Sequence, residues 1–390
     1  MDRKRKNRGR HHARRRRGKS SDPFAMLPDE LVMAVINAVG DPASLGKLAL
    51  ASRRFAGLVS DPSVWERLYV RHHGTLLHLQ FRSFGKNWRW LYRAMSFSVK
   101  RGRSDPKVGI ASLPSGGWVY CGDLRRGTAH GYGFASRHPI HGDSCQCRSD
   151  PHASNLKADG ERYEGQWKEG MRYGTGTYVA ANGDRYEGQW KDGDMCGDGT
   201  FSGSDGSTYR GHWKDGRRHG TGTGTYPTGD RYTGQWSQDT WSGLGELAYA
   251  DGTQVRGEWD DDELHGRAVT VRANGNRYDR AYVRGAVKGM TVDIYADGSS
   301  YVGESDDCKP HGRGAYVWSD GRSYAGCWQH GWYHGNGTMT YADGSRWCGT
   351  WEDNQKVEGF VIAHGRMDAV GGGGGKGTTG ACECMACSDP

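Results

Sequence analysis

A repeat of 23 residues runs through the C-terminal two thirds of the chain and limits its fold more than any other feature. The pattern that begins at Tyr163 as YEGQWKEGMRYGTGTYVAANGDR returns at Tyr186 and then at every 23rd residue up to Trp347. Eight units fill residues 163–346 without one insertion or deletion. Self-similarity at such a period is typical of a stacked array, in which each unit packs only against its neighbours.

One unit has the pattern of a β-hairpin. Tyr163, Gly165 and Trp167 alternate as one face of a strand requires, and the Lys-Glu-Gly that follows turns the chain. Gly174 and Gly176 on the return strand leave room for aromatic rings of the neighbouring unit. Because one hairpin cannot bury its own rings, the sequence predicts an antiparallel array of sixteen strands, about 75 Å long, with a grooved surface rather than a pocket.

The predicted repeat anchors are the tyrosines and tryptophans that recur in the first and fifth positions of the unit. They are Tyr163, Trp167, Tyr186, Trp190, Tyr209, Trp213, Tyr232, Trp236, Trp259, Trp328 and Trp351. The units that begin at Tyr278 and Tyr301 depart from the pattern, since Arg280 and Cys308 replace glycines and Tyr282 and Ser305 replace tryptophans. A kink, a specialised binding patch and simple drift under weak packing are all consistent with these departures.

Residues 24–71 have a helical pattern instead. Leu27, Leu31, Val35 and Val39 lie on one face at helical spacing, and Gly40-Asp41-Pro42 ends this helix. Three further short apolar segments follow, and Asp61-Pro62 separates the last two of them. Such a cluster of about 45 residues has little core of its own.

This segment resembles the F-box family. The resemblance rests on the opening Leu27-Pro28, the Asp41-Pro42 turn, the run Ser52-Arg53-Arg54-Phe55 and the closing Asp61-Pro62 with Trp65. It implies that the segment binds a Skp-type adaptor, and with it a cullin. The residues that match the family's apolar contacts are Leu27, Pro28, Leu31, Ile36, Leu45, Leu48, Phe55 and Trp65.

The array resembles the MORN family (membrane occupation and recognition nexus), on Tyr-x-Gly-x-Trp followed by Gly and Gly-x-Gly at period 23. An earlier divergent unit begins at Tyr120, and a 20-residue excess precedes Tyr163. The resemblance implies binding of a target protein or attachment to a phospholipid surface. Proteins that combine both families resemble products of large DNA viruses of amoebae.

The expected fold class is therefore α+β and multidomain: a small all-α F-box-like module followed by an elongated all-β antiparallel array of MORN hairpins. The expected domains are a disordered basic tail (1–22), the F-box-like domain (23–71), a helical linker (72–117), the array (118–360, with an insertion at about 135–158) and a Gly/Cys-rich tail (361–390).

The net charge of +8 comes from the N-terminal tail. Residues 1–22 hold eleven Lys or Arg and two Asp, or +9, which leaves −1 for the rest of the chain. The tail resembles a nuclear-import signal, with a nucleic-acid-binding arm and a solubilising tail as the alternatives. We therefore expect an intracellular protein, cytoplasmic or nuclear and within a host cell if the source is viral, with nucleic acid as a partner only through this tail.

Several groups of residues have a superficial likeness to chemical sites. Metal-binding residue types occur in His138, His141, Cys145, Cys147 and His152, but the Cys-x-Cys spacing there is not typical of a zinc site, and a flexible loop is the preferred interpretation. At Cys382, Cys384 and Cys387, three thiols with a fourth ligand could hold zinc, and a Gly-rich linker with a reduced tail is the preferred alternative. The GGGGGKGTTG segment lacks the Ser or Thr, the strand and the helix of a phosphate-binding loop. The evenly spaced His219, His265, His311 and His334 occupy one slot of the repeat, where a structural role is expected.

No nucleophile–base pair or carboxylate pair is apparent, so we expect no catalytic residue, no cofactor and no metal. Ten cysteines without a secretory signal are expected as reduced thiols. Together the two resemblances predict a substrate-recruiting adaptor of a cullin–RING ubiquitin ligase of the SCF type. The alternative is a MORN scaffold or membrane-associated interaction module without a ligase role.

Overall fold

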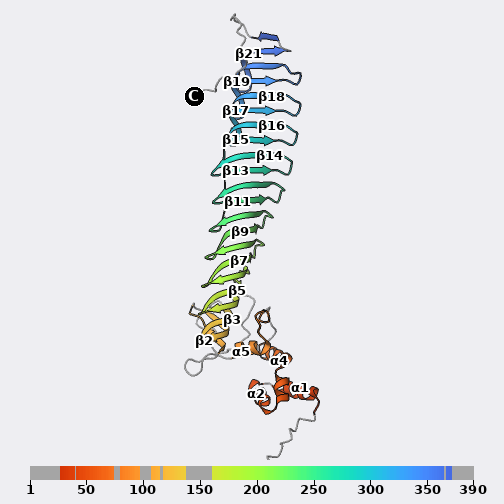
Figure 1. Ribbon diagram of the computed structural model, residues 1–390, viewed down its shortest axis with the longest axis vertical. Helices are drawn as coiled ribbons and strands as arrows, with labels where there is room; N and C mark the ends of the chain where they lie inside the picture. Colours follow the sequence, from red (N-terminus) through yellow and green to blue (C-terminus); the bar gives the residue numbers. More distant parts are fainter. Residues whose placement is uncertain are drawn as a thin grey trace, which may run out of the picture.

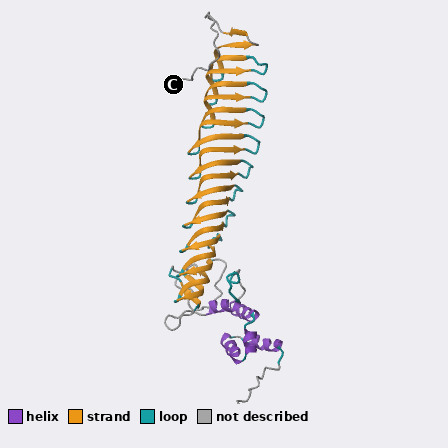
Figure 2. Ribbon diagram, viewed as in Figure 1, coloured by secondary structure: helices purple, strands orange, loops and turns teal. Residues whose placement is uncertain are grey.

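The computed structural model describes residues 27–39, 41–73, 80–96, 107–114, 117–137, 160–363 and 366–370. A small group of helices lies at one end of a long, narrow array of hairpins (Figure 1). Strands account for nearly the whole length of the molecule (Figure 2). This is the fold class that the sequence predicted.

Five helices form the N-terminal module of the described chain. They are α1 (Asp29–Ala38), α2 (Pro42–Ala51), α3 (Arg53–Val59), α4 (Pro62–His73) and α5 (Trp88–Ser96). Polar caps set two of their starts. Asp41 accepts a hydrogen bond from the amide of Ser44, and Ser52 accepts one from the amide of Phe55. None of the helices in the described residues is both long and apolar enough to span a membrane.

The remaining elements form one 22-stranded sheet. Its strands are β1 (Val108–Ser112), β2 (Trp118–Arg125), β3 (Thr128–Arg137), β4 (Glu161–Lys168), β5 (Met171–Val179), β6 (Arg185–Lys191), β7 (Asp194–Ser202), β8 (Thr208–Lys214), β9 (Arg217–Thr225), β10 (Arg231–Ser237), β11 (Thr240–Ala248), β12 (Gln254–Asp260), β13 (Glu263–Val271), β14 (Arg277–Val283), β15 (Ala286–Ile294), β16 (Ser300–Asp306), β17 (Lys309–Val317), β18 (Ser323–Gln329), β19 (Trp332–Thr340), β20 (Arg346–Glu352), β21 (Gln355–Ala363) and β22 (Arg366–Val370).

Each strand pairs antiparallel with the next along the chain, so the sheet is a continuous meander. At about 4.8 Å per strand it is about 100 Å long, longer than the 75 Å expected from sixteen strands. The difference arises at both ends. β1 lies in the segment expected to be a helical linker, and β2 and β3 form the divergent unit at Tyr120. At the other end, β20 and β21 form the unit that begins at Trp347, and β22 extends beyond residue 360.

Two kinds of turn repeat along the array. Within a unit the strands are joined by two residues with positive φ, such as Glu169 (50°) and Gly170 (83°), which is the geometry of a tight type I′ hairpin. Between units the chain turns through five residues, such as 180–184, and in three of these turns an aspartate or asparagine is hydrogen-bonded to the next turn. Asp184, for example, accepts a hydrogen bond from the amide of Ser204 at 2.8 Å.

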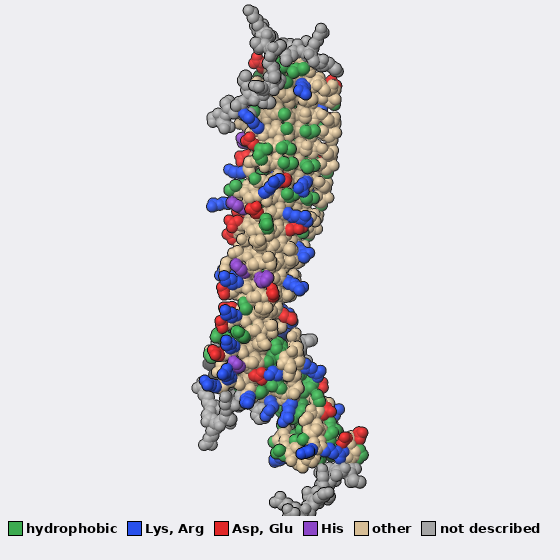
Figure 3. Space-filling view, viewed as in Figure 1, with side chains coloured by type: hydrophobic (Ala, Val, Ile, Leu, Met, Phe, Trp, Pro, Cys, Tyr) green, Lys and Arg blue, Asp and Glu red, His purple; other side chains and the backbone are tan. Residues whose placement is uncertain are grey.

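Acidic and basic side chains are interspersed along the whole array in the view of Figure 3, in keeping with its small net charge. Its interior consists of two aromatic clusters, one reaching from Leu113 to Trp259 and one from Tyr301 to Trp351. A third cluster joins the helices to the first strands of the array.

Candidate partner-binding surfaces

Every anchor tyrosine sits over a pair of glycines. Gly165 and Gly176 face each other across β4 and β5, and a Cβ on Gly176 would lie 2.5 Å from the Tyr163 ring. The Tyr163 hydroxyl donates a hydrogen bond of 3.0 Å to the carbonyl of Gln166. The same bond recurs in the next three units. The glycines are therefore required because a ring occupies the space of their side chains.

Every anchor tryptophan ties its hairpin to the one before it. The Trp190 indole N–H donates to the carbonyl of Gly176 at 3.1 Å, and its ring packs edge-on against Tyr163 at 5.2 Å. Equivalent bonds join Trp213, Trp236, Trp259, Trp328 and Trp351 to the glycine 14 residues earlier. All eleven predicted anchors are buried. They build the array, and we call the side of the sheet that they pack on the aromatic face.

The unit at 278–300 breaks this column with a buried ion pair. We call the two facing glycines beneath each anchor tyrosine, such as Gly165 and Gly176, the seat glycines. In this unit Arg280 replaces the first seat glycine and Thr291 replaces the second. The Arg280 guanidinium makes two hydrogen bonds to the Asp293 carboxylate, at 2.7 and 2.9 Å, and lies 4.5 Å from the Tyr278 ring. Both side chains of the pair are largely buried, at 12% and 7% exposure. The departure seen in the sequence is thus a compensated polar substitution that separates the two aromatic clusters.

The residues predicted to contact a Skp-type adaptor fall into two groups. Ile36, Leu45, Phe55 and Trp65 are buried in the core of the helical module, whereas Pro28 and Leu31 are exposed. The remaining two, Leu27 and Leu48, are partly buried against that core. The assignment stays a prediction, but only the second group and the partly buried pair offer surface to a partner.

An apolar stripe lies open on α1. Leu31 and Val35, one helical turn apart, are 54% and 43% exposed, and Leu50 at the end of α2 is 89% exposed. Arg54 fixes the start of α1 because its guanidinium bonds both the Asp29 carboxylate, at 2.5 Å, and the carbonyl of Leu27. Val35 and Leu50 were not among the predicted contacts. The helical spacing of Leu31 and Val35 could have indicated Val35.

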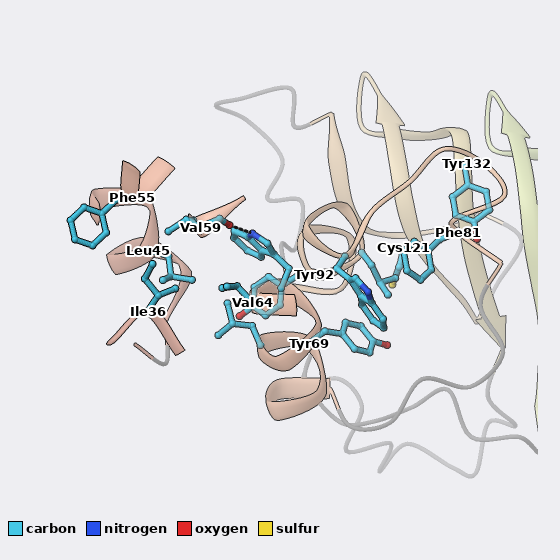
Figure 4. Packing of buried hydrophobic residues seen from close by; sticks show 14 of the residues in the cluster. Ile36, Leu45, Phe55, Val59, Val64, Tyr69, Phe81, Tyr92, Cys121 and Tyr132 are labelled. Carbon is cyan, nitrogen blue, oxygen red and sulfur yellow. Dashed lines mark hydrogen bonds between the residues drawn. The ribbon is translucent and has the colours of Figure 1, made fainter. Parts of the chain in front are cut away.

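The helical module and the array share a core. Figure 4 shows buried side chains that continue from Phe55 and Ile36 through Tyr69 and Tyr92 to Cys121 and Tyr132 on the first strands. At this junction Phe84 stacks on Tyr132, with ring centroids 4.5 Å apart, and the Trp90 ring lies 5.2 Å from it.

Asp123 is the polar centre of the junction. Its carboxylate accepts hydrogen bonds from the Trp90 indole at 2.7 Å, from the Lys86 ammonium at 2.6 Å and from the Tyr132 amide at 3.0 Å. Nearby, Glu164 accepts bonds from the Tyr132 hydroxyl and the Gln80 amide, and burial raises the pKa of its carboxyl. Helix α5 therefore covers the side of the sheet opposite the aromatic face, which we call the back face, at its N-terminal end.

Further along, the back face becomes apolar and is uncovered among the described residues. The exposed side chains alternate with the buried anchors on β13 to β17 and pair across strands, as Val292 does with Val302. They are Val271, Met290, Val292, Ile294, Val302 and Val317, each between 37% and 61% exposed. Sequence reasoning missed them because it followed the aromatic positions only.

A second row of aromatic residues lines one edge of the aromatic face. They occupy the repeat slot that follows the return strand, directly before the turn to the next unit. The first two units have Ala180 and Gly203 in this slot, and Arg272 is the one later member that is not aromatic. Successive positions in this slot are Tyr226, Tyr249, Arg272, Tyr295, Trp318 and Tyr341, which we call the edge row. None of these six side chains is buried. The sequence analysis did not identify this row, although the 23-residue period that revealed the anchors also contains it.

The other candidate sites receive no support for a chemical role. No group of three or more metal-binding side chains occurs in the described part of the chain, and the predicted metal residues of the insertion and C-terminal tail lie outside it, as does the GGGGGKGTTG segment. His219, His311 and His334 each have a buried Nδ1 atom without a hydrogen-bond partner. Cys121, Cys196 and Cys308 are free thiols, whereas Cys327 is disulfide-bonded, so the expectation of reduced thiols is wrong for Cys327.

Comparison with protein families assigns both halves of the molecule. Residues 24–71 match the F-box-like family model. Eight segments match the MORN repeat model: 120–135, 163–185, 186–208, 209–231, 232–254, 256–277, 301–321 and 324–346. The chain thus contains an F-box-like domain and eight MORN repeats, and the unit with the buried ion pair lies in the gap between the matched segments at 277 and 301. A search of the curated proteins found no match.

Several solved structures show a weak likeness to the array. The TCP10 domain of Danio rerio CPAP is 14% identical at a TM-score of 0.30, over 53% of this chain and 95% of that one. The TCP10c domain of Drosophila melanogaster Sas-4 is 14% identical at 0.24, over 38% and 90%. Virginiamycin B lyase from Staphylococcus aureus is 9% identical at 0.14, over 55% and 81%. At these scores none of the three carries an argument about this chain.

Proposed function

We propose that this protein is a non-catalytic, substrate-recruiting adaptor of a cullin–RING ubiquitin ligase of the SCF type. The F-box-like domain binds a Skp-type adaptor, and through it a cullin, while the MORN array binds a target protein. The observation that carries the proposal is an F-box-like domain with an open apolar stripe on α1, joined through a shared core to a long repeat surface.

In this role the chain contributes geometry rather than chemistry. A target held on the array is kept near a ubiquitin-charged enzyme that the ligase partners supply, so transfer is accelerated by proximity. The packed junction around Asp123 supports this role because it fixes the direction in which the array leaves the helical module.

A pull-down from eukaryotic cell extract tests the ligase half of the proposal. The tagged full chain is expected to recover a Skp-type adaptor and a cullin, and a variant with Leu31→Ser and Val35→Ser is expected to lose both. Leu27→Ala with Pro28→Ala is the companion variant at the start of α1. Val283→Ser is the matched control, since Val283 is a similarly exposed valine (52%) on the array. If neither the parent chain nor the Val283→Ser control recovers a Skp-type adaptor, the proposed ligase role is refuted.

The apolar back face favours one second candidate, a MORN scaffold that attaches to a phospholipid surface without a ligase role. Six aliphatic side chains on β13 to β17 form an exposed patch of the kind that marks membrane or protein contact. Flotation with vesicles containing phosphatidylserine is then expected to retain the chain, and Ile294→Lys to release it. Failure to float at low salt removes this candidate.

The place of action is also a proposal. We infer an intracellular protein, cytoplasmic or nuclear, whose basic tail at residues 1–22 acts as an import signal; this tail lies outside the described residues. Redirection of a host ligase by a virus follows only if the resemblance to proteins of large DNA viruses holds. A fluorescent fusion with and without residues 1–22 tests the import signal directly.

A further inference from the structure

The edge row has a spacing that one kind of peptide matches. Successive positions are separated by two strands, hence by about 9.6 Å at about 4.8 Å per strand. A polyproline II helix has three residues per turn with a rise of about 3.1 Å per residue, so one turn is about 9.3 Å long. An extended proline-rich segment lying along this edge therefore presents the same side of its helix to every repeat.

Three adjacent repeats carry the best developed part of the row. Tyr295, Trp318 and Tyr341 are consecutive and partly exposed. The rings of Tyr295 and Trp318 pack against other rings of the array: Tyr316 lies 6.0 Å from Tyr295 and 4.8 Å from Trp318, and Tyr333 lies 6.4 Å from Trp318. Tyr341 instead contacts Lys356, whose ammonium donates a hydrogen bond of 2.6 Å to the Tyr341 hydroxyl. Aromatic side chains that are fixed in this way bind proline rings at little cost in conformational entropy.

The same positions offer hydrogen-bond donors. Among the described residues, neither the Trp318 indole N–H nor the Tyr295 hydroxyl makes a hydrogen bond to another side chain or backbone group. The backbone of a polyproline II segment is solvated and has its carbonyl oxygens free to accept such bonds. The row thus has both the apolar surface and the polar groups that a proline-rich segment needs.

Carboxylates accompany the row at the same period. Asp297, Asp320 and Asp343 each follow their aromatic residue by two positions. Hydrogen bonds from Ser299 lower the pKa of Asp297, and those from Arg322 lower that of Asp320, so both are ionised at neutral pH. Arg322 already pairs with Asp320 at 2.7 Å, and its guanidinium lies over the Trp318 ring at 5.3 Å. The array itself therefore shows how an arginine is held between ring and carboxylate.

We propose that Tyr295, Trp318 and Tyr341 dock a proline-rich polyproline II segment that carries a basic residue once per turn. The target class of the array is then a protein with such a segment. This inference rests on the proposed role of the array as the target-binding half of the adaptor. The peptide titration needs no ligase component. Failure of the peptide to bind therefore says nothing about binding of the Skp-type adaptor, and failure of the pull-down says nothing about binding of the peptide.

The test is a titration of the full chain into a fluorescently labelled peptide of four Pro-Pro-Arg triplets, followed by anisotropy. Saturable binding is expected, and Trp318→Ala is expected to weaken it at least tenfold. Trp332→Ala is the matched control, since Trp332 is a half-exposed tryptophan (50%) in the same repeats but at the start of a return strand, at the opposite end of the hairpin. Circular dichroism of both variants verifies that the array stays folded.

Three further peptides separate the proposal from its alternatives on the unaltered chain. Four Gly-Ser-Arg triplets keep the charge without the polyproline helix, and four Pro-Pro-Glu triplets keep the helix with the opposite charge. The third is the original peptide with one glycine inserted after the second triplet, which rotates the later prolines away from the row. Each is expected to bind at least tenfold more weakly. Equal binding by any of them, equal loss in Trp318→Ala and Trp332→Ala, or no binding of the Pro-Pro-Arg peptide overturns the proposal.

Discussion

At the scale of single residues, the array depends on the absence of side chains as much as on their presence. A tyrosine ring lies where the Cβ atoms of two facing glycines would be, such as Gly165 and Gly176 beneath Tyr163. The glycine of Tyr-x-Gly and the second glycine of Gly-x-Gly are therefore steric requirements in the units that carry them. The tryptophan then covers that ring from the next hairpin and donates to the glycine carbonyl beneath it. Four positions, a tyrosine, two facing glycines and the tryptophan of the next hairpin, thus define one unit of the core.

Replacing one seat glycine tests this account. In Gly199→Ala the new Cβ meets the Tyr186 ring at 2.6 Å, and the cost of overpacking a buried site is about 1 to 3 kcal/mol. Gly224→Ala is the control, since its Cβ meets the Trp236 ring at 3.2 Å and needs a smaller adjustment. Urea unfolding is expected to rank Gly199→Ala as the less stable. Equal midpoints for the two variants contradict the steric argument.

The Arg280–Asp293 pair gives a second prediction at this scale. Asp293→Ala leaves the Arg280 guanidinium buried without its partner, which costs about 3 to 5 kcal/mol. A double variant with Arg280→Gly and Asp293→Leu restores residues found in the same slots of other units, Gly234 and Leu247, and is expected to be as stable as the parent. Thermal unfolding of the three chains measures this difference. A double variant as unstable as Asp293→Ala would show that the pair is not the relevant interaction.

At the scale of elements, burial of so many phenol groups makes the stability of the array sensitive to alkali. Burial raises the pKa of Tyr209 to about 12 from an ordinary 10.0, and burial also raises the pKa of Tyr186 and Tyr232. A raised pKa means that the folded state holds its proton longer than the unfolded chain does. The stabilisation is therefore complete below pH 10 and is lost as the pH rises through 12.

The expected result is a melting temperature that is constant from pH 7 to 9 and falls steeply above pH 10, measured by circular dichroism. Tyrosine absorbance recorded in parallel should show the buried phenols ionising together with unfolding. If they ionise near pH 10 while the sheet signal is unchanged, the tyrosines are not buried as the structure shows.

Much of this element structure could be predicted from the 23-residue period, because packing between hairpins is local and repeats the same contacts. The turns and the burial of all eleven anchors followed from Tyr163 and its equivalents. The strand β1 and its place beneath α5 did not, because they depend on packing of Ile110 into a core that also contains Leu91 and residues more distant in sequence. The exposed stripe on α1 also depends on which helices cover Ile36 rather than Leu31, which helical periodicity does not decide.

At the scale of the whole molecule, the distance between the two binding regions matters as much as the regions themselves. The proposed peptide site on β15 to β19 is far along the array from the helical module (Figure 1). A target bound far along the array is held at a fixed position relative to the ligase only if the array is rigidly joined to the helical module. Here the junction is the core shared by α5, the loop at Phe84 and the first strands, with Asp123 at its centre.

Asp123→Ala is expected to loosen this junction while leaving both halves folded. The change removes the acceptor for the Trp90 indole and the Lys86 ammonium, and a bond to the charged Lys86 contributes about 1.5 to 3 kcal/mol. Small-angle X-ray scattering should then show a wider range of shapes, with the peptide and Skp-type adaptor affinities unchanged. Ubiquitin transfer to a target bound on the array should fall, because proximity without fixed geometry is less productive. Asp260→Ala, an exposed aspartate on β12, is the control. Scattering identical to that of the parent would mean that apolar packing alone fixes the array, and transfer would then be unaffected.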